Sequence, residues 1–264
     1  MRFGAADRLA FALVLGVAAV ALLGFAARAQ PLANKDYCAD DGTNVMFVID
    51  VTTEYDPKDK ELLVRAVGDI FDSLQGGERI VIRSITASFA TSDRLIDRCI
   101  PTCLAKSFLD RWLNCSDGLI VSDTRRVKQE IVQSLRRRLE NLTELPRSDI
   151  IRTLAHVSRE EARRERRQIL YILSDLIENS EKVTARLFFE TENGRLIRYL
   201  RKYDLIASLE GVEVRAFGVG RGSTQDRLPL PVGHHKKLLD FWHLYFKEAK
   251  AGSVEISQNM IEHR

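Results

Sequence analysis

Short, unbroken apolar runs alternate along this chain with longer stretches in which apolar residues recur every three or four positions. The clearest run is residues 45–49, VMFVI, which is rich in β-branched and aromatic side chains and stops at Asp50. Such a run is typical of a strand buried on both faces of a sheet. Similar runs predict further strands at residues 79–87, 94–100, 168–174 and 212–219, and residues 94–100 are expected to pair antiparallel with the second strand.

Helical spacing of apolar residues separates most of these strands. It predicts helices over residues 57–75, 123–145, 150 to about 166, 194–209 and 235–249. Strands that alternate with helices predict an α/β fold, a three-layer Rossmann-like sandwich around a mainly parallel central sheet with one antiparallel edge strand. The predicted domain covers residues 44–250. Residues 101–122 are interpreted as a cysteine-containing insertion, residues 30–43 as a lead-in segment and residues 251–264 as a C-terminal tail.

The N-terminus carries a targeting signal. Two arginines precede residues 9–27, which contain no charge, and a small-x-small site follows that signal peptidase could cut after Ala29. Nineteen apolar residues are also just enough for a transmembrane helix. Residues 1–29 are therefore either a cleaved signal peptide or an N-terminal hydrophobic helix that anchors the chain in a membrane. Both interpretations place the rest outside the cytoplasm, in the periplasm or at the cell surface, because the basic flank stays inside.

All four cysteines lie in the exported part of the chain, so disulfide bonds are expected. Three connectivities are possible. The first cysteine precedes the first strand and the others lie close together, so at least one bridge should tie the N-terminal segment to the 99–115 region, or two thiols stay free. Zinc is the alternative, but no histidine lies near the cluster. The candidates are Cys38, Cys99, Cys103 and Cys115.

The charge balance excludes some partners. The chain has 40 basic and 37 acidic residues; cleavage after Ala29 would remove three arginines and one aspartate and leave 37 − 36 = +1. Arginine clusters at 136–138 and 159–167 are interleaved with acids and are typical of solvated helix faces. Because the chain is expected to be exported from the cytoplasm and contains no aromatic–basic motif, it is not expected to bind nucleic acid.

Oxygen-bearing side chains follow the predicted strands at matching places. Asp50, Thr52 and Glu54 come directly after the first strand, Ser148 precedes a helix, and Asp175 follows the strand at 168–174. In a parallel sheet with right-handed crossovers these strand ends lie side by side, where open α/β sheets bind ligands. Hard oxygen ligands of this kind suit Mg²⁺. Alternatively, Asp50 and the threonines only form a turn and cap the next helix.

The same residues resemble the von Willebrand factor type A (vWA) domain family over roughly residues 44–250. Residues 50–54, DVTTE, stand where this family has its D-x-S-x-S motif; residues 146–150, PRSDI, resemble its G-T-D-I loop, and residues 173–175, LSD, its L-T-D-G. The resemblance implies a divergent metal-ion-dependent adhesion site that holds Mg²⁺ or another divalent cation. Its implied ligands are Asp50, Thr52, Glu54, Ser148 and Asp175.

Three departures bear on this site. Thr52 and Ser148 replace other hydroxyl residues and so keep a hydroxyl ligand. Glu54 replaces a serine, and three outcomes are open: the carboxylate strengthens cation binding, fills the coordination position that a partner would take, or pairs with an arginine so that no metal binds. The resemblance therefore implies a protein-binding module rather than an enzyme, exported or tethered to a membrane through residues 9–27, with a partner protein that the sequence does not identify.

An enzymatic alternative rests on the same stretch. A buried strand that ends in Asp50 also resembles the haloacid dehalogenase phosphatases, Mg²⁺-dependent hydrolases in which this aspartate would be the nucleophile. Such enzymes usually carry a second aspartate where Thr52 stands here, and no lysine is clearly placed, although Asp175 and Glu178 could supply an acidic pair. His234, His235 and His243 lack the i, i+4 spacing of a helical metal site.

Overall fold

A computed structural model describes residues 37–52, 55, 57–104, 115–142, 145–163, 166–220 and 230–258. These residues belong to a unit that begins at Tyr37. The predicted N-terminal hydrophobic helix and the cleavage site at Ala29 lie outside the described residues. Within the described ranges, the helices are too short or too polar to cross a membrane.

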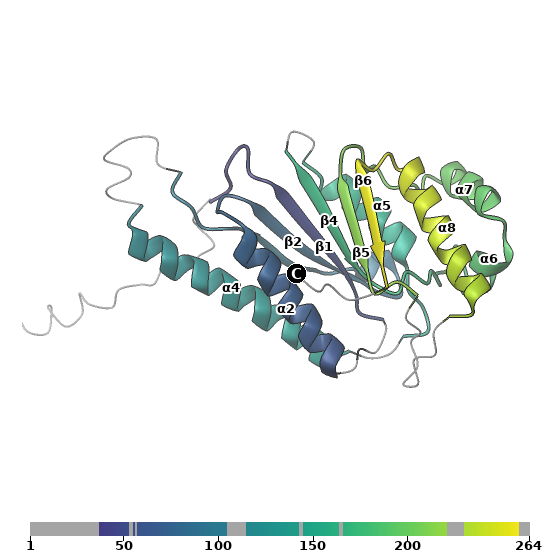
Figure 1. Cartoon of the computed structure of the whole chain (residues 1–264), viewed down its shortest axis with the longest axis horizontal. Coiled ribbons are helices and arrows are strands. Elements are labelled where there is room, and N and C mark those ends of the chain that lie inside the picture. The colour runs from purple at the N-terminus through teal and green to yellow at the C-terminus, as the bar shows by residue number, and fades with distance from the viewer. Residues whose placement is uncertain are drawn as a thin grey trace, which may run out of the picture. The chain divides into compact units, whose positions relative to one another are not determined.

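A six-stranded sheet lies at the centre of this unit (Figure 1). Its order is β3-β2-β1-β4-β5-β6, and every neighbouring pair is parallel except β2 with β3. The predicted mainly parallel sheet with one antiparallel edge strand is therefore confirmed. The strands are β1 Asn44–Asp50, β2 Arg79–Ile85, β3 Arg94–Cys99, β4 Gln168–Leu173, β5 Glu213–Phe217 and β6 Ser253–Ser257.

The position of β1 explains its unbroken apolar run. It lies between β2 and β4, with Val45 opposite both Ile80 and Ile169, and all seven of its residues are buried. Helices cover both faces of the sheet, so apolar side chains are needed on both sides of the strand. Asp50 is the last residue of β1 and lies at the carboxyl edge of the sheet.

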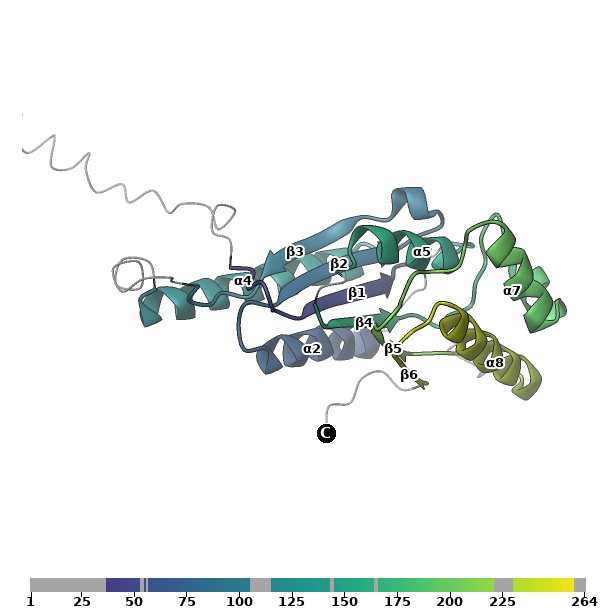
Figure 2. The same cartoon turned by 90° about the horizontal axis from the view of Figure 1, so that it is seen from above.

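Helices form a layer on each face of the sheet (Figures 1 and 2). α2 and α4 pack together on one face, while α5 and α8 share a buried core with β1, β4 and β5 on the other. The fold is thus a three-layer α/β sandwich. The helices are α2 Pro57–Ser73, α4 Asp117–Glu140, α5 Ile150–Glu160, α6 Ala185–Glu190, α7 Asn193–Lys202 and α8 Val232–Glu248.

Several element boundaries differ from the predicted ones. α4 begins at Asp117 rather than at position 123, because the Ser116 side chain accepts a hydrogen bond from the Leu119 N–H and caps the helix. Its first turns therefore occupy the end of the predicted insertion at 101–122. α6 was not predicted because its six residues are too few to show helical periodicity. The Thr184 side chain caps it by accepting the Leu187 N–H. The tail at 251–264 contributes β6, whose pairing with β5 decides its conformation.

Both pairs of cysteines are bridged. Cys38 is bonded to Cys99 and Cys103 to Cys115, and no cysteine in the described residues is free. The predicted tie between the N-terminal segment and the 99–115 region is confirmed, and the zinc interpretation is wrong because all four sulfurs are used in disulfides. Two disulfides indicate an oxidising, extracytoplasmic compartment.

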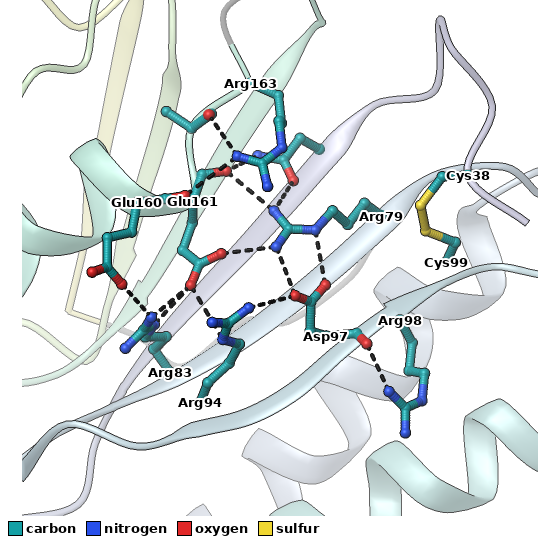
Figure 3. Close-up of polar contacts among 12 residues, drawn as sticks. Cys38, Arg79, Arg83, Arg94, Asp97, Arg98, Cys99, Glu160, Glu161 and Arg163 are labelled. Carbon is teal, nitrogen blue, oxygen red and sulfur yellow. Dashed lines mark hydrogen bonds and ion pairs between the residues drawn. A yellow bond between two sulfur atoms is a disulfide. The ribbon is translucent and has the colours of Figure 1, made fainter. Parts of the chain in front are cut away.

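A buried ionic cluster fixes the end of α5 against β2 and β3 (Figure 3). The Glu161 carboxylate accepts hydrogen bonds from Arg79 at 2.8 Å and from Arg83 at 2.7 Å. Arg79 also donates two 2.8 Å bonds to Asp97 on β3. Arg79 is the first residue of β2, so the cluster begins at the opposite end of the sheet from Asp50. In this cluster the Glu161 carboxylate balances the positive charges of Arg79 and Arg83, which are buried in the sheet.

Candidate functional site

The candidate site lies at the carboxyl edge of the sheet, between β1 and β4. The chain passes from β1 to β2 on one side and later returns to β4 on the other side of β1. The edge where the strand order reverses in this way is a topological switch point, which is where open α/β sheets bind ligands. β1 ends here at Asp50, and β4 is followed here by Ser174 and Asp175.

The Asp50 carboxylate is the centre of this site. It is fully buried and accepts four hydrogen bonds. Its Oδ1 accepts the Thr52 N–H at 2.9 Å and the Thr52 hydroxyl at 2.6 Å. Its Oδ2 accepts the hydroxyls of Ser148 at 3.0 Å and of Ser174 at 2.8 Å. Ser148 and Ser174 are 98 and 124 residues away from Asp50 in the sequence, yet both reach its carboxylate. This agrees with the prediction that the carboxyl ends of the parallel strands lie side by side.

Asp175 lies beside this carboxylate. Its Oδ1 accepts the Ile177 N–H at 2.9 Å, and the residue keeps a partly exposed surface. Burial raises the pKa of the Asp175 carboxyl to about 8, and the negative charge of Asp50 adds to this effect. Burial also raises the pKa of Asp50, against the hydrogen bonds from its neighbours. A positive charge placed beside these two adjacent carboxyls would favour their ionised forms and would itself be stabilised by them.

Pairing of two loops holds the Ser148 hydroxyl over Asp50. The Ser148 N–H donates to the Asn179 carbonyl and the Asn179 N–H to the Ser148 carbonyl, each at 3.0 Å. The Asn179 side chain also donates to the Pro146 carbonyl at 2.5 Å. The segment before α5 is thus tied to the segment after β4, so Ser148 and Asp175 are positioned as one unit.

Glu178 and Asp149 take structural roles beside the site. The Glu178 Oε2 accepts the N–H groups of Ile150 and Ile151, each at 2.9 Å, and so caps α5. Burial raises the pKa of Glu178 to about 8. The Asp149 Oδ2 accepts the Phe89 N–H at 2.9 Å and pairs with Arg152 at 2.7 Å. Both carboxylates therefore bind the backbone or an arginine.

Leu176 adopts a conformation that the sequence did not reveal. It follows Asp175 at the position where the vWA motif has glycine, and its φ is 58°, in the left-handed region. A leucine there costs about 1–2 kcal/mol. Its side chain is fully buried and its carbonyl accepts the Trp242 Nε1–H at 2.8 Å, which offsets this cost. The sequence shows only that a leucine stands where the motif has glycine; the contacts that hold its backbone come from residues far away along the chain.

Other sequence candidates stand apart from the site or cannot be placed. Glu54 lies outside the described residues. His234 stacks on Phe189 with ring centroids 4.6 Å apart, and His235 contacts Gln258. In the part of the chain that the structure describes, no three His, Cys, Asp or Glu side chains gather to hold a metal. A cation at the Asp50 site would therefore need the hydroxyl oxygens as well as the carboxylates.

Comparisons with known proteins show no family. No protein-family model matches the chain, and no curated protein matches its sequence. Among solved structures, it is similar to proximal thread matrix protein 1 from the mussel byssus, with 14% identity, a TM-score of 0.38 and coverage of 81% of this chain and 49% of that one. It is also similar to the human COPII-coat protein Sec24c, with 11% identity, a TM-score of 0.41 and coverage of 86% and 30%. The chain spans less than half the length of either protein, and likenesses this low carry no argument about function.

Proposed function

We propose that this chain is an exported, vWA-like module that binds a partner protein at the carboxyl edge of its sheet, with Mg²⁺ or another divalent cation held beside Asp50. The observation that carries the proposal is the convergence of the hydroxyls of Thr52, Ser148 and Ser174 on one buried carboxylate. Asp175 lies next to Asp50 at the same edge of the sheet. We also propose that the chain is related to the vWA family, on the basis of these residues and of the strand order in the sheet.

The donor set fits a hard cation. Each of the three hydroxyls gives its proton to Asp50. The Ser174 oxygen also accepts the Leu176 N–H at 3.0 Å, so the hydroxyl oxygens of Thr52 and Ser148 are the ones proposed to bind a cation. Oxygen ligands of mixed charge are those that Mg²⁺ takes in proteins. The expected ligands are Thr52, Ser148 and Asp175, with Asp50 acting directly or through water and Glu54 as a fifth candidate. A bound cation would act as a Lewis acid toward a carboxylate of the partner.

The geometry supports binding rather than reaction. A nucleophilic aspartate needs a free oxygen that faces the substrate, whereas both oxygens of Asp50 accept two hydrogen bonds and the residue is fully buried. Glu178, the acid that a phosphatase would require nearby, binds the backbone of α5 instead. The phosphatase alternative therefore gains no support from the arrangement of these side chains.

The setting of the proposed module is extracytoplasmic. Two disulfides support an oxidising compartment, and the uncharged residues 9–27 would either direct export or anchor the chain in the membrane. A protein partner is the expected ligand because the Asp50 site lies on loops at one edge of a rigid sheet, where recognition surfaces are commonly built.

Calorimetric titration of the oxidised, exported chain with Mg²⁺ and Mn²⁺ tests this function. We expect saturable binding, and the substitution Asp175→Asn should weaken it at least about tenfold because it removes one of the carboxylates next to the cation. Asp240→Asn is the matched control, since Asp240 is an exposed carboxylate on α8 that pairs with Lys236. A flat titration of the wild-type chain with both metals would remove the cation from the proposal.

A further inference from the structure

The outward face of α4 carries four arginines that make no ion pair with another described residue. Every exposed residue between positions 123 and 139 of this helix is arginine or glutamine. Ion pairs of α4 in the described residues involve Lys128 with Asp72 and Glu130 with Arg98, on the flanks of the helix. The exposed residues are Arg125, Arg126, Gln129, Gln133, Arg136 and Arg137. We call the four arginines among them the cationic stripe.

Helix geometry arranges the cationic stripe in two parallel rows. Arg125 and Arg136 are eleven residues apart, as are Arg126 and Arg137, and eleven residues complete about three turns. Each pair therefore lies on the same side of the helix, roughly 17 Å apart along its axis. The opposite side of α4 is buried through Val127, Ile131, Leu135 and Leu139. Successive residues are about 100° apart around a helix, so the two pairs form two rows along the outward face, with Gln129 and Gln133 between them.

The chain enters the described unit against this same helix. The Tyr37 hydroxyl donates a 2.5 Å hydrogen bond to Asp123, and Asp123 lies two residues before Arg125 on α4. Ten residues lead from the end of the uncharged segment at Ala27 to Tyr37, a span of at most roughly 35 Å. If residues 9–27 stay in the bilayer, α4 is held within reach of the lipid headgroups.

We propose that the cationic stripe docks on an anionic phospholipid surface. Guanidinium groups bind phosphate oxygens through paired, charge-assisted hydrogen bonds, and two exposed rows of long arginine side chains on an outward-facing helix can reach several headgroups at once. The arginine run at 136–138 was interpreted from the sequence as a solvated face, and Arg136 and Arg137 are exposed; the helix places Arg136 in a row with Arg125 and Arg137 in a row with Arg126. This inference goes beyond the proposed cation site and does not depend on it.

Vesicle sedimentation of residues 30–264 tests the proposal. The described unit contains the whole sheet, its core and both disulfides within this range, so this chain folds without the N-terminal segment. At low ionic strength it should bind equimolar phosphatidylcholine–phosphatidylglycerol vesicles at least about tenfold more tightly than pure phosphatidylcholine vesicles. Molar salt should abolish the difference, because it shortens the screening length to about 3 Å.

A charge-matched pair of variants locates the contact. Replacement of Arg125, Arg126, Arg136 and Arg137 by glutamine should weaken binding to the anionic vesicles by about a hundredfold. The control replaces four exposed cations on α7 and α8, at the other end of the molecule from α4 (Figure 1). It has the same net charge and should bind like the wild type. The control residues are Arg195, Arg198, Lys202 and Lys236.

Three results would overturn the proposal. The first is a stripe variant that binds the anionic vesicles as tightly as the wild type. The second is a control variant that loses as much binding, which would mean that net charge alone is responsible. The third is binding of poly-glutamate through the stripe without binding of vesicles, which would assign the face to an acidic protein. Thermal unfolding of both variants should match the wild type, because all eight side chains are exposed.

Discussion

The substitution Glu161→Gln should lower the free energy of unfolding by about 3–5 kcal/mol. Glu161 is almost completely buried and faces Arg79 and Arg83, each of which is only 6% exposed. Its carboxylate accepts hydrogen bonds from both arginines (Figure 3). The glutamine keeps the size of the side chain but removes the one buried carboxylate that the two guanidinium groups share. It leaves Arg79 with Asp97 and Arg83 with Glu160, whose side chains are 31% and 47% exposed. Urea denaturation with the disulfides intact measures the change.

The neighbouring residue supplies a matched control. Glu160 also pairs with Arg83, at 2.7 Å, but its side chain is 47% exposed. Water screens an ion pair at such a position, so Glu160→Gln should cost no more than about 1 kcal/mol. Equal, small losses for the two variants would show that the cluster is not buried as described.

The same cluster gives the acid dependence of stability its sign. Burial alone would raise the pKa of Glu161, but hydrogen bonds from Arg83 and Arg79 outweigh it and hold the pKa below its ordinary value of 4.5. A carboxyl with a lowered folded-state pKa stabilises the fold above that ordinary value and loses its contribution as the pH falls through the folded pKa. The wild type should therefore lose stability below about pH 4.5 more steeply than Glu161→Gln does.

The substitution Asp50→Ala should lower the free energy of unfolding by about 2–4 kcal/mol. It leaves the N–H and hydroxyl of Thr52 and the hydroxyls of Ser148 and Ser174 without their buried acceptor. Asp50→Asn should cost about 1 kcal/mol or less, because the amide can still bond these groups and no longer repels Asp175. Both variants should lower the affinity for Mn²⁺ by about a hundredfold.

Comparison of the two variants separates structure from function. Unfolding experiments report the stability of each, and calorimetry reports cation binding by the same samples. A stable Asp50→Asn variant that binds Mn²⁺ as tightly as the wild type would show that the Asp50 charge contributes nothing to a cation site. A fully stable Asp50→Ala variant would show that the four hydrogen bonds do not anchor this edge of the sheet.

The central part of this site could be predicted from the sequence. Parallel strands bring their carboxyl ends to one edge, so the rule that places Asp50 at the end of β1 also places Asp175 after β4. Ser148 was predicted to approach the same edge, and its hydroxyl does reach Asp50. These predictions held because they depend on strand order and direction, which apolar runs reveal.

The supports of the site could not be predicted in the same way. Glu178 binds backbone N–H groups of α5, and Asn179 pairs with Ser148 through main-chain atoms, so no side-chain pattern announces either contact. Leu176 has an unfavourable backbone conformation that only its buried neighbours make tolerable. Each of these features depends on tertiary contacts rather than on local preference.

The ionic cluster was missed for a related reason. Arg79 and Arg83 stand in a run that otherwise reads as a buried strand, and Glu161 lies far away in sequence among solvated charges. Periodicity identifies the strand but does not show which distant carboxylate will balance its charges. The strand β6 was missed because only its pairing with β5 selects an extended conformation for that segment.

A crystal structure of the exported chain with Mn²⁺, recorded for anomalous scattering, tests the central claim most directly. We expect one strong anomalous peak at the end of β1, within coordination distance, roughly 2 Å, of the hydroxyl oxygens of Thr52 and Ser148 and beside the carboxyl of Asp175. Electron density that shows these three side chains apart, or together with no metal at saturating Mn²⁺, would contradict it.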